Sequence, residues 1–324
     1  MVFSALWMLP DEFVSVCCKA FQYINHVLIR SLVRYCYCLG FFLLNVLATC
    51  QQNTVQHQQL QSGRIPGEVL ILDSMHFNWC PPGTFMMGSP SSERGHRSDE
   101  QQVEVILTQG FWMGTFEVTQ KQWLAIMDHF PDNLPQEKWG EGPAFPVYWV
   151  NYPEALQFCN EMTDRWQKSG MIPHDWMVWL PTEAQWEYAC RAGNQKATAF
   201  GDTLQLSEAN FNPLNTVDHI PLKATPVGSY PPNAWGIYDM HGNEFEWCLD
   251  WYHGRLPGGI DPDLSQIRGV PNRDGSYSRV RRGGAWNDEY IYCRSAFRLR
   301  YEPERRADHI GFRVVLKQAK PTGN

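Results

Sequence analysis

The chain has 324 residues, enough for one large domain or two modest ones with a substantial apolar core. Its formal net charge is −7, and it has no long block of Lys or Arg, so nucleic acid is excluded as an expected partner. With 25 Gly and 22 Pro beside 14 Trp, the composition indicates a fold rich in turns and loops that is held together by large aromatic side chains.

Residues 1–50 have the features of a leader. A basic stretch at residues 30–34 precedes a nearly uncharged run at residues 35–48, which is typical of a secretory signal. The run ends in Leu47-Ala48-Thr49-Cys50, similar to a bacterial lipoprotein processing site, so Cys50 is a candidate for lipid attachment. An uncleaved anchor is the alternative, although the run is shorter than the roughly 20 residues of a membrane span. We expect an exported protein, periplasmic or on the cell surface, that contacts a membrane only through this anchor or lipid.

A polar, Gln-rich tether at residues 51–65 leads into the expected folded domain, residues 66–317, and residues 318–324 form a tail. Three helix starts have the same capping pattern, a capping side chain three residues before Glu or Gln. The pairs are Thr119 with Gln122, Asn151 with Glu154, and Thr182 with Gln185. Gly193 suits the position just after the third helix.

Short strands are expected at residues 69–72, 83–87, 103–107, 111–116 and 311–316. Turn residues are frequent in most of the chain after residue 195, and such a long irregular segment needs interactions that hold it together if it is to be compact. Buried Trp side chains or metal ions are the candidates.

Five cysteines follow the leader, and an odd number leaves at least one thiol free or paired between chains. We therefore expect no complete disulfide framework, and their spacing does not indicate a zinc site. The five are Cys80, Cys159, Cys190, Cys248 and Cys293.

Five motifs stand in order along the chain, and the order is more specific than any one of them. They occupy residues 81–89, 111–119, 180–193, 233–247 and 282–313, and they include Gly242-Asn243-Glu244-Phe245-Glu246-Trp247 and Arg282-Gly283-Gly284. Together they resemble the formylglycine-generating enzyme family, also called sulfatase-modifying factors, over about residues 80–316. The resemblance implies a single α+β domain of an irregular, C-type-lectin-like kind with little regular secondary structure.

The resemblance also implies a copper site. Enzymes of the family hold Cu(I) between two cysteines that follow the double glycine, and they oxidise a sulfatase cysteine to formylglycine with oxygen. Counting from Gly283-Gly284 places Asp288 at the first position and Cys293 at the second. A carboxylate is too hard a ligand to replace a thiolate on Cu(I). Cys293 is then either a small buried residue or a lone reactive thiol, and Cys248 is a distant candidate for a second ligand.

Calcium is the second ion that the resemblance implies. Family members bind it with the residues that match Asn243 and Glu246, and a backbone carbonyl at Glu244 would complete the set. The alternative is that Asn243 caps a turn and that Glu246 is a surface carboxylate. A second calcium site is expected at Asn210, the Phe211 carbonyl and Asp218.

Nine arginines between residues 279 and 313 either pair with local carboxylates or form a rim for an anionic ligand, such as a sulfated glycan or an acidic peptide. Three functions are open. The first is an exported binding or accessory member without the copper thiolate pair. The second is an active copper oxidase that acts on a sulfatase or a related thiol protein. The third is a structural module of the cell envelope. The sequence leaves enzymatic activity undecided.

Overall fold

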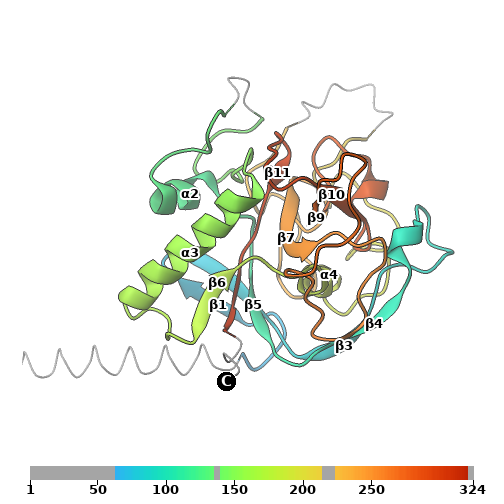
Figure 1. The fold of residues 1–324 in the computed structure, drawn as a ribbon, viewed down its shortest axis with the longest axis horizontal. Coiled ribbons are helices and arrows are strands. Elements are labelled where there is room, and N and C mark those ends of the chain that lie inside the picture. Colours follow the sequence, from blue (N-terminus) through green and yellow to red (C-terminus); the bar gives the residue numbers. More distant parts are fainter. Residues whose placement is uncertain (1–62, 135–138, 214–222, 320–324) are drawn as a thin grey trace, which may run out of the picture. The chain divides into compact units, whose positions relative to one another are not determined.

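A computed structural model describes residues 63–134, 139–213 and 223–319 (Figure 1). Residue contacts divide the chain into Met1–Gln58 and Gln59–Asn324, and every described residue belongs to the second unit. The expected leader, nearly all of the expected tether and most of the expected tail lie outside the described residues. Within these ranges, no helix combines the length and the apolar character that crossing a membrane requires.

Twelve short strands form three sheets in the described part of the chain. The five-stranded sheet is antiparallel and joins β12, near the C-terminus, to strands from the first half of the chain. Its order is β1 (Val69–Leu72), β2 (Met75–Cys80), β5 (Phe111–Gly114), β12 (Val315–Gln318) and β6 (Trp176–Trp179). The four-stranded sheet has the order β10 (Arg298–Tyr301), β9 (Arg279–Arg282), β7 (Phe245–Trp251) and β11 (Ile310–Gly311). The three-stranded sheet has the order β3 (Gly83–Met87), β4 (Val103–Leu107) and β8 (Gly259–Ile260).

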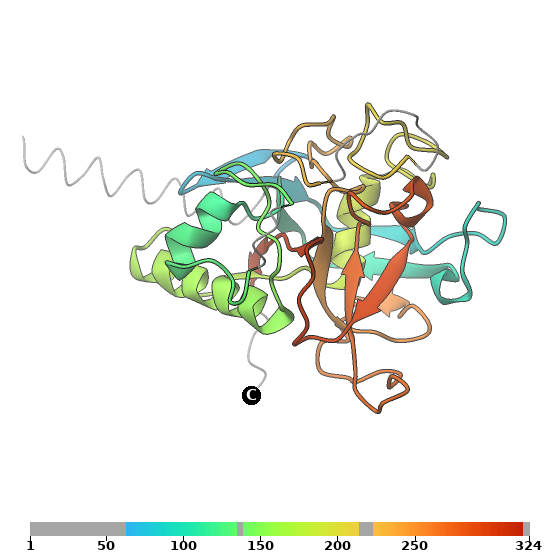
Figure 2. The ribbon, with the colours of Figure 1, turned by 90° about the horizontal axis from the view of Figure 1, so that it is seen from above.

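Three α-helices begin where the capping pattern predicted. They are α2 (Gln120–Met127), α3 (Tyr152–Lys168) and α4 (Glu183–Arg191), and in each one both reciprocal bonds of the capping box are formed. Figures 1 and 2 show α2 and α3 next to each other on one side of the domain, whereas α4 lies between the sheets and contacts β3, β7 and β9. The described residues also form two short 3-10 helices, η1 (Ser98–Glu100) and η2 (Tyr290–Tyr292).

The core is built largely from aromatic rings, as the composition indicated. In the largest cluster, Trp123 of α2 stacks on Phe158 of α3 with ring centroids 5.7 Å apart, and Phe312 packs edge-on against both. A second cluster surrounds the buried face of α4 and includes Trp186 and Cys248. All five cysteines of the domain are buried free thiols, which confirms that no complete disulfide framework holds this part of the chain.

The strand predictions are partly confirmed. Residues 69–72, 83–87 and 103–107 are strands with the predicted bounds, and the fourth strand ends at Gly114 rather than at residue 116. The single strand expected at residues 311–316 is wrong, because the chain forms β11 beside β7 and then moves to the five-stranded sheet as β12. Strands β2, β6, β7, β8, β9 and β10 were not predicted.

Candidate functional site

The two C-terminal motif blocks lie against each other. The amide of Gly242 donates to the carbonyl of Gly283 at 2.9 Å, and the amide of Trp286 donates to the carbonyl of Asn243 at 2.9 Å. Gly284 has a φ of 73°, and a Cβ added to it would lie 2.7 Å from Cys293 Sγ. Glycine is therefore required at position 284 for two reasons, a left-handed backbone and close packing on Cys293.

A buried ion pair holds the start of this segment. Arg282 donates to Glu187 of α4, and its two terminal NH₂ groups also donate to the carbonyls of Ser295, Ala296 and Phe297. Both charged side chains are fully buried. One guanidinium thus joins α4, β9 and the chain that leads into β10, which fixes both ends of the turn containing Cys293.

Two neighbouring arginines are anchored in the same way. Arg294 donates to Glu100 at 2.9 and 3.0 Å, and Arg298 donates to Glu183 at 2.6 and 2.7 Å. The predicted pairing with carboxylates is confirmed, but these carboxylates lie more than a hundred residues upstream rather than nearby in sequence. Because these side chains are at most 2% exposed, they do not form a surface rim for an anionic ligand.

The Cys293 side chain lies in a small apolar cluster with Leu204, Ala209 and Phe211. Its side chain is fully buried, and the thiol donates to the Glu289 carbonyl at 3.7 Å. Burial raises the pKa of the Cys293 thiol well above its usual value, and the negative charge of Asp288 raises it further. Since the thiolate is the form that binds metals and attacks electrophiles, Cys293 in this arrangement is not activated.

Asp288 lies at the edge of the same turn and is partly exposed. Its carboxylate accepts from the amide of Ala285 at 3.1 Å. Burial raises the pKa of Asp288 above its ordinary value, while the charges of His309 and Arg281 act in the opposite direction. The position that the family resemblance assigns to a soft sulfur ligand therefore presents a hard oxygen next to cationic and polar groups.

The other candidate thiol belongs to a different part of the core. Cys248 lies in the cluster around α4, and Cys293 lies in the smaller cluster described above.

His241 has a role that the sequence did not suggest. Its Nδ1 bonds the Cys293 carbonyl at 2.7 Å, and its Nε2 accepts from the amide of Ala199 at 3.0 Å. Burial lowers the pKa of His241 to about 4, so it is a neutral ring that positions the Cys293 backbone.

The structure brings together the expected calcium residues Asn210 and Asn243. The Asn243 amide oxygen accepts from Asn210 Nδ2 at 3.1 Å and from the amide of Thr225 at 2.9 Å, and its Nδ2 donates to Glu117 at 2.6 Å. Phe211 packs in the Cys293 cluster, and Asp218 lies outside the described residues. Asn243 also has a φ of 63°, as a turn residue does.

The carboxylates of Glu246 and Glu244 are in opposite situations. Glu246 is fully buried, pairs with Arg313 through two bonds of 2.6 Å, and accepts from Trp186 Nε1 at 2.7 Å. Glu244 is equally buried, but neither of its carboxylate oxygens has a hydrogen-bond partner among the described residues. Burial and then the charge of Glu117 raise the pKa of Glu244 well above its usual value.

These contacts decide which ions the residues fit as they stand. Asp288 and the buried, protonated Cys293 do not fit Cu(I), which requires soft ligands. The Asn243 and Glu246 oxygens already receive N–H donors, so they could ligate calcium only after a rearrangement, whereas the Glu244 carboxylate has oxygens to offer. Across residues 63–134, 139–213 and 223–319, no three His, Cys, Asp or Glu side chains are grouped closely enough to hold a metal ion together.

Comparison with known proteins agrees with the motif order. Residues 72–318 match the family model described as the sulfatase-modifying factor enzyme 1-like domain, which is more than half of the chain. The chain belongs to this family. It is 30% identical over 195 residues to the formylglycine-generating enzyme of Bos taurus, a match that covers 56% of this chain and 46% of the bovine protein. It thus spans less than half the length of that relative.

Two further proteins are similar to this chain over most of its length. The chaperone protein LppX of Paenibacillus barcinonensis is 26% identical over 244 residues, which cover 63% of this chain and 79% of LppX. PvdO from Pseudomonas aeruginosa superposes with a TM-score of 0.64 at 27% identity, over 79% of this chain and all of PvdO. The sulfatase-modifying-factor domain therefore has the irregular α+β, C-type-lectin-like fold that the sequence predicted.

Sequence reasoning missed the acidic partners of the arginines. Glu183 and Glu187 are four residues apart and lie on the buried face of α4, where apolar side chains are the rule. Two glutamates on such a face could have indicated buried ion pairs. Nothing in the sequence indicated that Arg282 and Arg298 would be their partners.

Proposed function

We propose that this protein is an exported accessory or binding member of the sulfatase-modifying-factor family that lacks the copper thiolate pair. The observation that supports this is the state of the two positions that the oxidase chemistry needs. Asp288 replaces one thiol, and the other, Cys293, is fully buried, bonded to the Glu289 carbonyl and strongly biased towards its protonated form.

Several observations support an accessory role over catalysis. The Cys293 backbone is fixed by His241, and Gly284 packs directly on its sulfur, so opening the thiol to a substrate would disrupt several contacts. A relative of similar sequence is named as a chaperone protein, which fits a domain that binds another polypeptide. A protein or peptide, including a sulfatase, is therefore the partner that we propose first, and an anionic glycan is the alternative. The basic and apolar leader at residues 30–48 supports export to the periplasm or the cell surface.

The deciding experiment compares the parent protein with Asp288→Cys, which restores the second thiol at the family position. Both are reduced, titrated with Cu(I) against a chelating competitor, and incubated under oxygen with a sulfatase-motif peptide whose mass is followed. We expect the parent to bind Cu(I) weakly and to leave the peptide thiol intact. Asp288→Cys should bind Cu(I) more tightly.

Three results bear on the proposal directly. Tight one-to-one copper binding by the parent, with conversion of the peptide thiol to an aldehyde, would establish an active oxidase and refute the accessory role. Binding of a version of the peptide with Ala in place of Cys, without turnover of the thiol peptide, would support it. If neither peptide nor any glycan of a sulfated panel binds, a structural envelope module replaces the proposal.

Calcium at the Asn243–Glu246 segment stays a proposal, and a separate observation supports it. A carboxyl group buried without any hydrogen bond is costly, and the Glu244 side chain is in this state beside a second acid, Glu117. A bound cation would remove the cost if the Asn243 amide released its present donors. We expect calcium to raise the thermal stability of the parent protein but not of Glu244→Gln. Equal responses to calcium and chelator in both would exclude a role for this side chain.

A further inference from the structure

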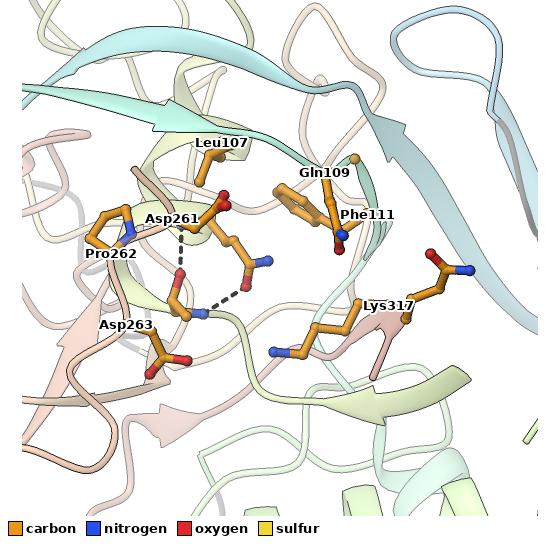
Figure 3. A pocket seen from close by; sticks show the side chains of 11 residues that line it. Leu107, Gln109, Phe111, Asp261, Pro262, Asp263 and Lys317 are labelled. Atoms are coloured by element: carbon orange, nitrogen blue, oxygen red, sulfur yellow. Dashed lines mark hydrogen bonds between the residues drawn. The ribbon is translucent and has the colours of Figure 1, made fainter. Parts of the chain in front are cut away.

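A pocket lined by both charged and apolar residues lies away from the Asp288–Cys293 turn and shares no residue with it. Its volume is about 270 Å³, and four segments that are distant in sequence line it. They are the turn between β4 and β5, the first turn of α4, the loop after β8 and the end of β12. Figure 3 shows the pocket from close by.

The acidic wall of the pocket is a rigid loop. The backbone amide and the hydroxyl of Thr108 both donate to the carboxylate of Asp261, and the amide of Asp261 donates to the Ile106 carbonyl at 2.8 Å. Asp261 has a φ of 45°, a left-handed conformation that these bonds maintain. Asp263 follows two residues later and accepts from the amide of Ser265 at 3.0 Å. Two carboxylates are therefore presented from a fixed backbone.

The opposite wall carries the donors. Figure 3 shows Lys317 extending across the pocket from the side opposite Asp261 and Asp263. Gln185 of α4 uses its amide oxygen to accept from the amide of Thr182 at 3.0 Å, which leaves its NH₂ group as the part it can offer to a ligand. The N-terminus of α4 adds positive potential on this side. Asp263 and Lys317 both have further interactions within the protein, so both charged groups are held in position.

This arrangement excludes most classes of ligand. Leu107, Phe111 and Pro262 supply apolar surface to the lining. A purely apolar ligand would nevertheless displace water from Asp261, Asp263 and Lys317 without replacing its hydrogen bonds, which is unfavourable. Two carboxylates on a fixed loop oppose a phosphate or a sulfate. A ligand with separated charges of both signs matches the walls, and the volume suits a molecule smaller than a typical drug.

We propose that this pocket binds a small zwitterion with a primary ammonium and a carboxylate, of the chemical class of a free α-amino acid. The ammonium lies against Asp261 and Asp263, and the carboxylate receives Lys317 and the Gln185 amide. Charge-assisted hydrogen bonds of both signs then fix the orientation of the ligand. The proposal is independent of the function proposed for the Asp288–Cys293 turn.

The test titrates the purified protein with each of the common L-amino acids by calorimetry and thermal shift. Any amino acid that binds is compared with its decarboxylated amine, with the acid that lacks the amino group, and with glucose as a neutral polar probe. We expect one or more amino acids to bind, and removal of either charge to weaken binding roughly tenfold or more, since each charge-assisted bond contributes more than a neutral one.

Variants locate the binding. Lys317→Met keeps the aliphatic stem and removes the charge, and Asp263→Asn removes one carboxylate with little change of shape. Both should lose binding roughly tenfold or more, whereas Lys196→Met, at an exposed pair with Asp202, should bind as the parent does. Thermal unfolding of each variant checks that it is folded. If either Lys317→Met or Asp263→Asn fails to fold, the other variant alone carries the test.

Three outcomes overturn the proposal. One is the absence of binding by every amino acid up to about 10 mM, a concentration well above the Kd of a specific small-molecule site. Another is binding of glucose or of a single-charge probe as tightly as the amino acid. The third is binding that Lys317→Met and Asp263→Asn leave unchanged.

Discussion

Replacing Glu246 by Gln tests whether this residue acts as an internal counter-charge. Gln keeps the size of the side chain and removes its charge, so Arg313 remains fully buried without its bidentate partner. Breaking a buried pair from one side costs about 3–5 kcal/mol, because the remaining charge is uncompensated. Glu117 and Asp239 also favour the charged form of Arg313 and offset part of the loss. We therefore expect the low end, about 3 kcal/mol.

The matched control is Glu302→Gln, which removes the partner of Arg305 at the surface. That pair is 3.6 Å long and the arginine is 63% exposed, so its loss should change stability by less than about 0.5 kcal/mol. Urea denaturation followed by circular dichroism measures both variants. For a domain of this size, the Glu246→Gln change corresponds to a fall in Tm of roughly 6–12 °C.

Two results would contradict the reasoning. If Glu246→Gln is as stable as Glu302→Gln, the buried pair with Arg313 does not hold the fold. If a chelator lowers the stability of the parent to that of Glu246→Gln and has no further effect on the variant, Glu246 acts through a bound cation instead.

Three further predictions follow from single contacts. Gly284→Ala should destabilise the domain by about 2–3 kcal/mol, because alanine is strained at a φ of 73° and its Cβ would lie 2.7 Å from Cys293 Sγ; a urea midpoint equal to that of the parent would refute it. Asn151→Ala should cost about 1 kcal/mol in the same assay through loss of the α3 cap, and no loss would show that the cap contributes nothing. Burial raises the pKa of Asp250 to about 7, so the folded state holds this proton more tightly than the unfolded state does. The contribution of Asp250 to the free energy of unfolding should therefore fall by about 4 kcal/mol as the pH rises from about 4 to 7. Asp250→Asn should lack this decline when urea unfolding is measured across that pH range.

The sequence predicted those parts of the fold that local interactions determine. The capping boxes at Thr119, Asn151 and Thr182 involve residues only three apart, and each helix begins at the predicted place. Strand β7 (Phe245–Trp251) was missed although apolar residues alternate along it with Glu246, Cys248 and Asp250. The turn-forming residues on both sides of it indicated an irregular segment instead. The end of the chain was misassigned because β11 and β12 join different sheets, which depends on long-range pairing.

The same division holds for the candidate site. Counting from the double glycine located Asp288 and Cys293, but it gave no information about the depth of the thiol or its bond to the Glu289 carbonyl. Glu246 was found as a motif residue, whereas its partner Arg313 lies 67 residues further along the chain. Pairing over such distances depends on the whole fold, and one sequence cannot supply it.

The buried ion pairs explain how a loop-rich domain can hold the Cys293 turn in one conformation. A buried pair contributes little net stability compared with apolar residues of the same volume, but it is satisfied in few geometries. Arg282 and Arg294 are anchored to Glu187 and Glu100 on either side of this turn, so its two ends are fixed independently of the side chain at position 288. Asp288→Cys should therefore leave the fold intact. A gain in copper affinity by that variant would then reflect the ligand chemistry alone, which makes the exchange a direct test of what the parent lacks.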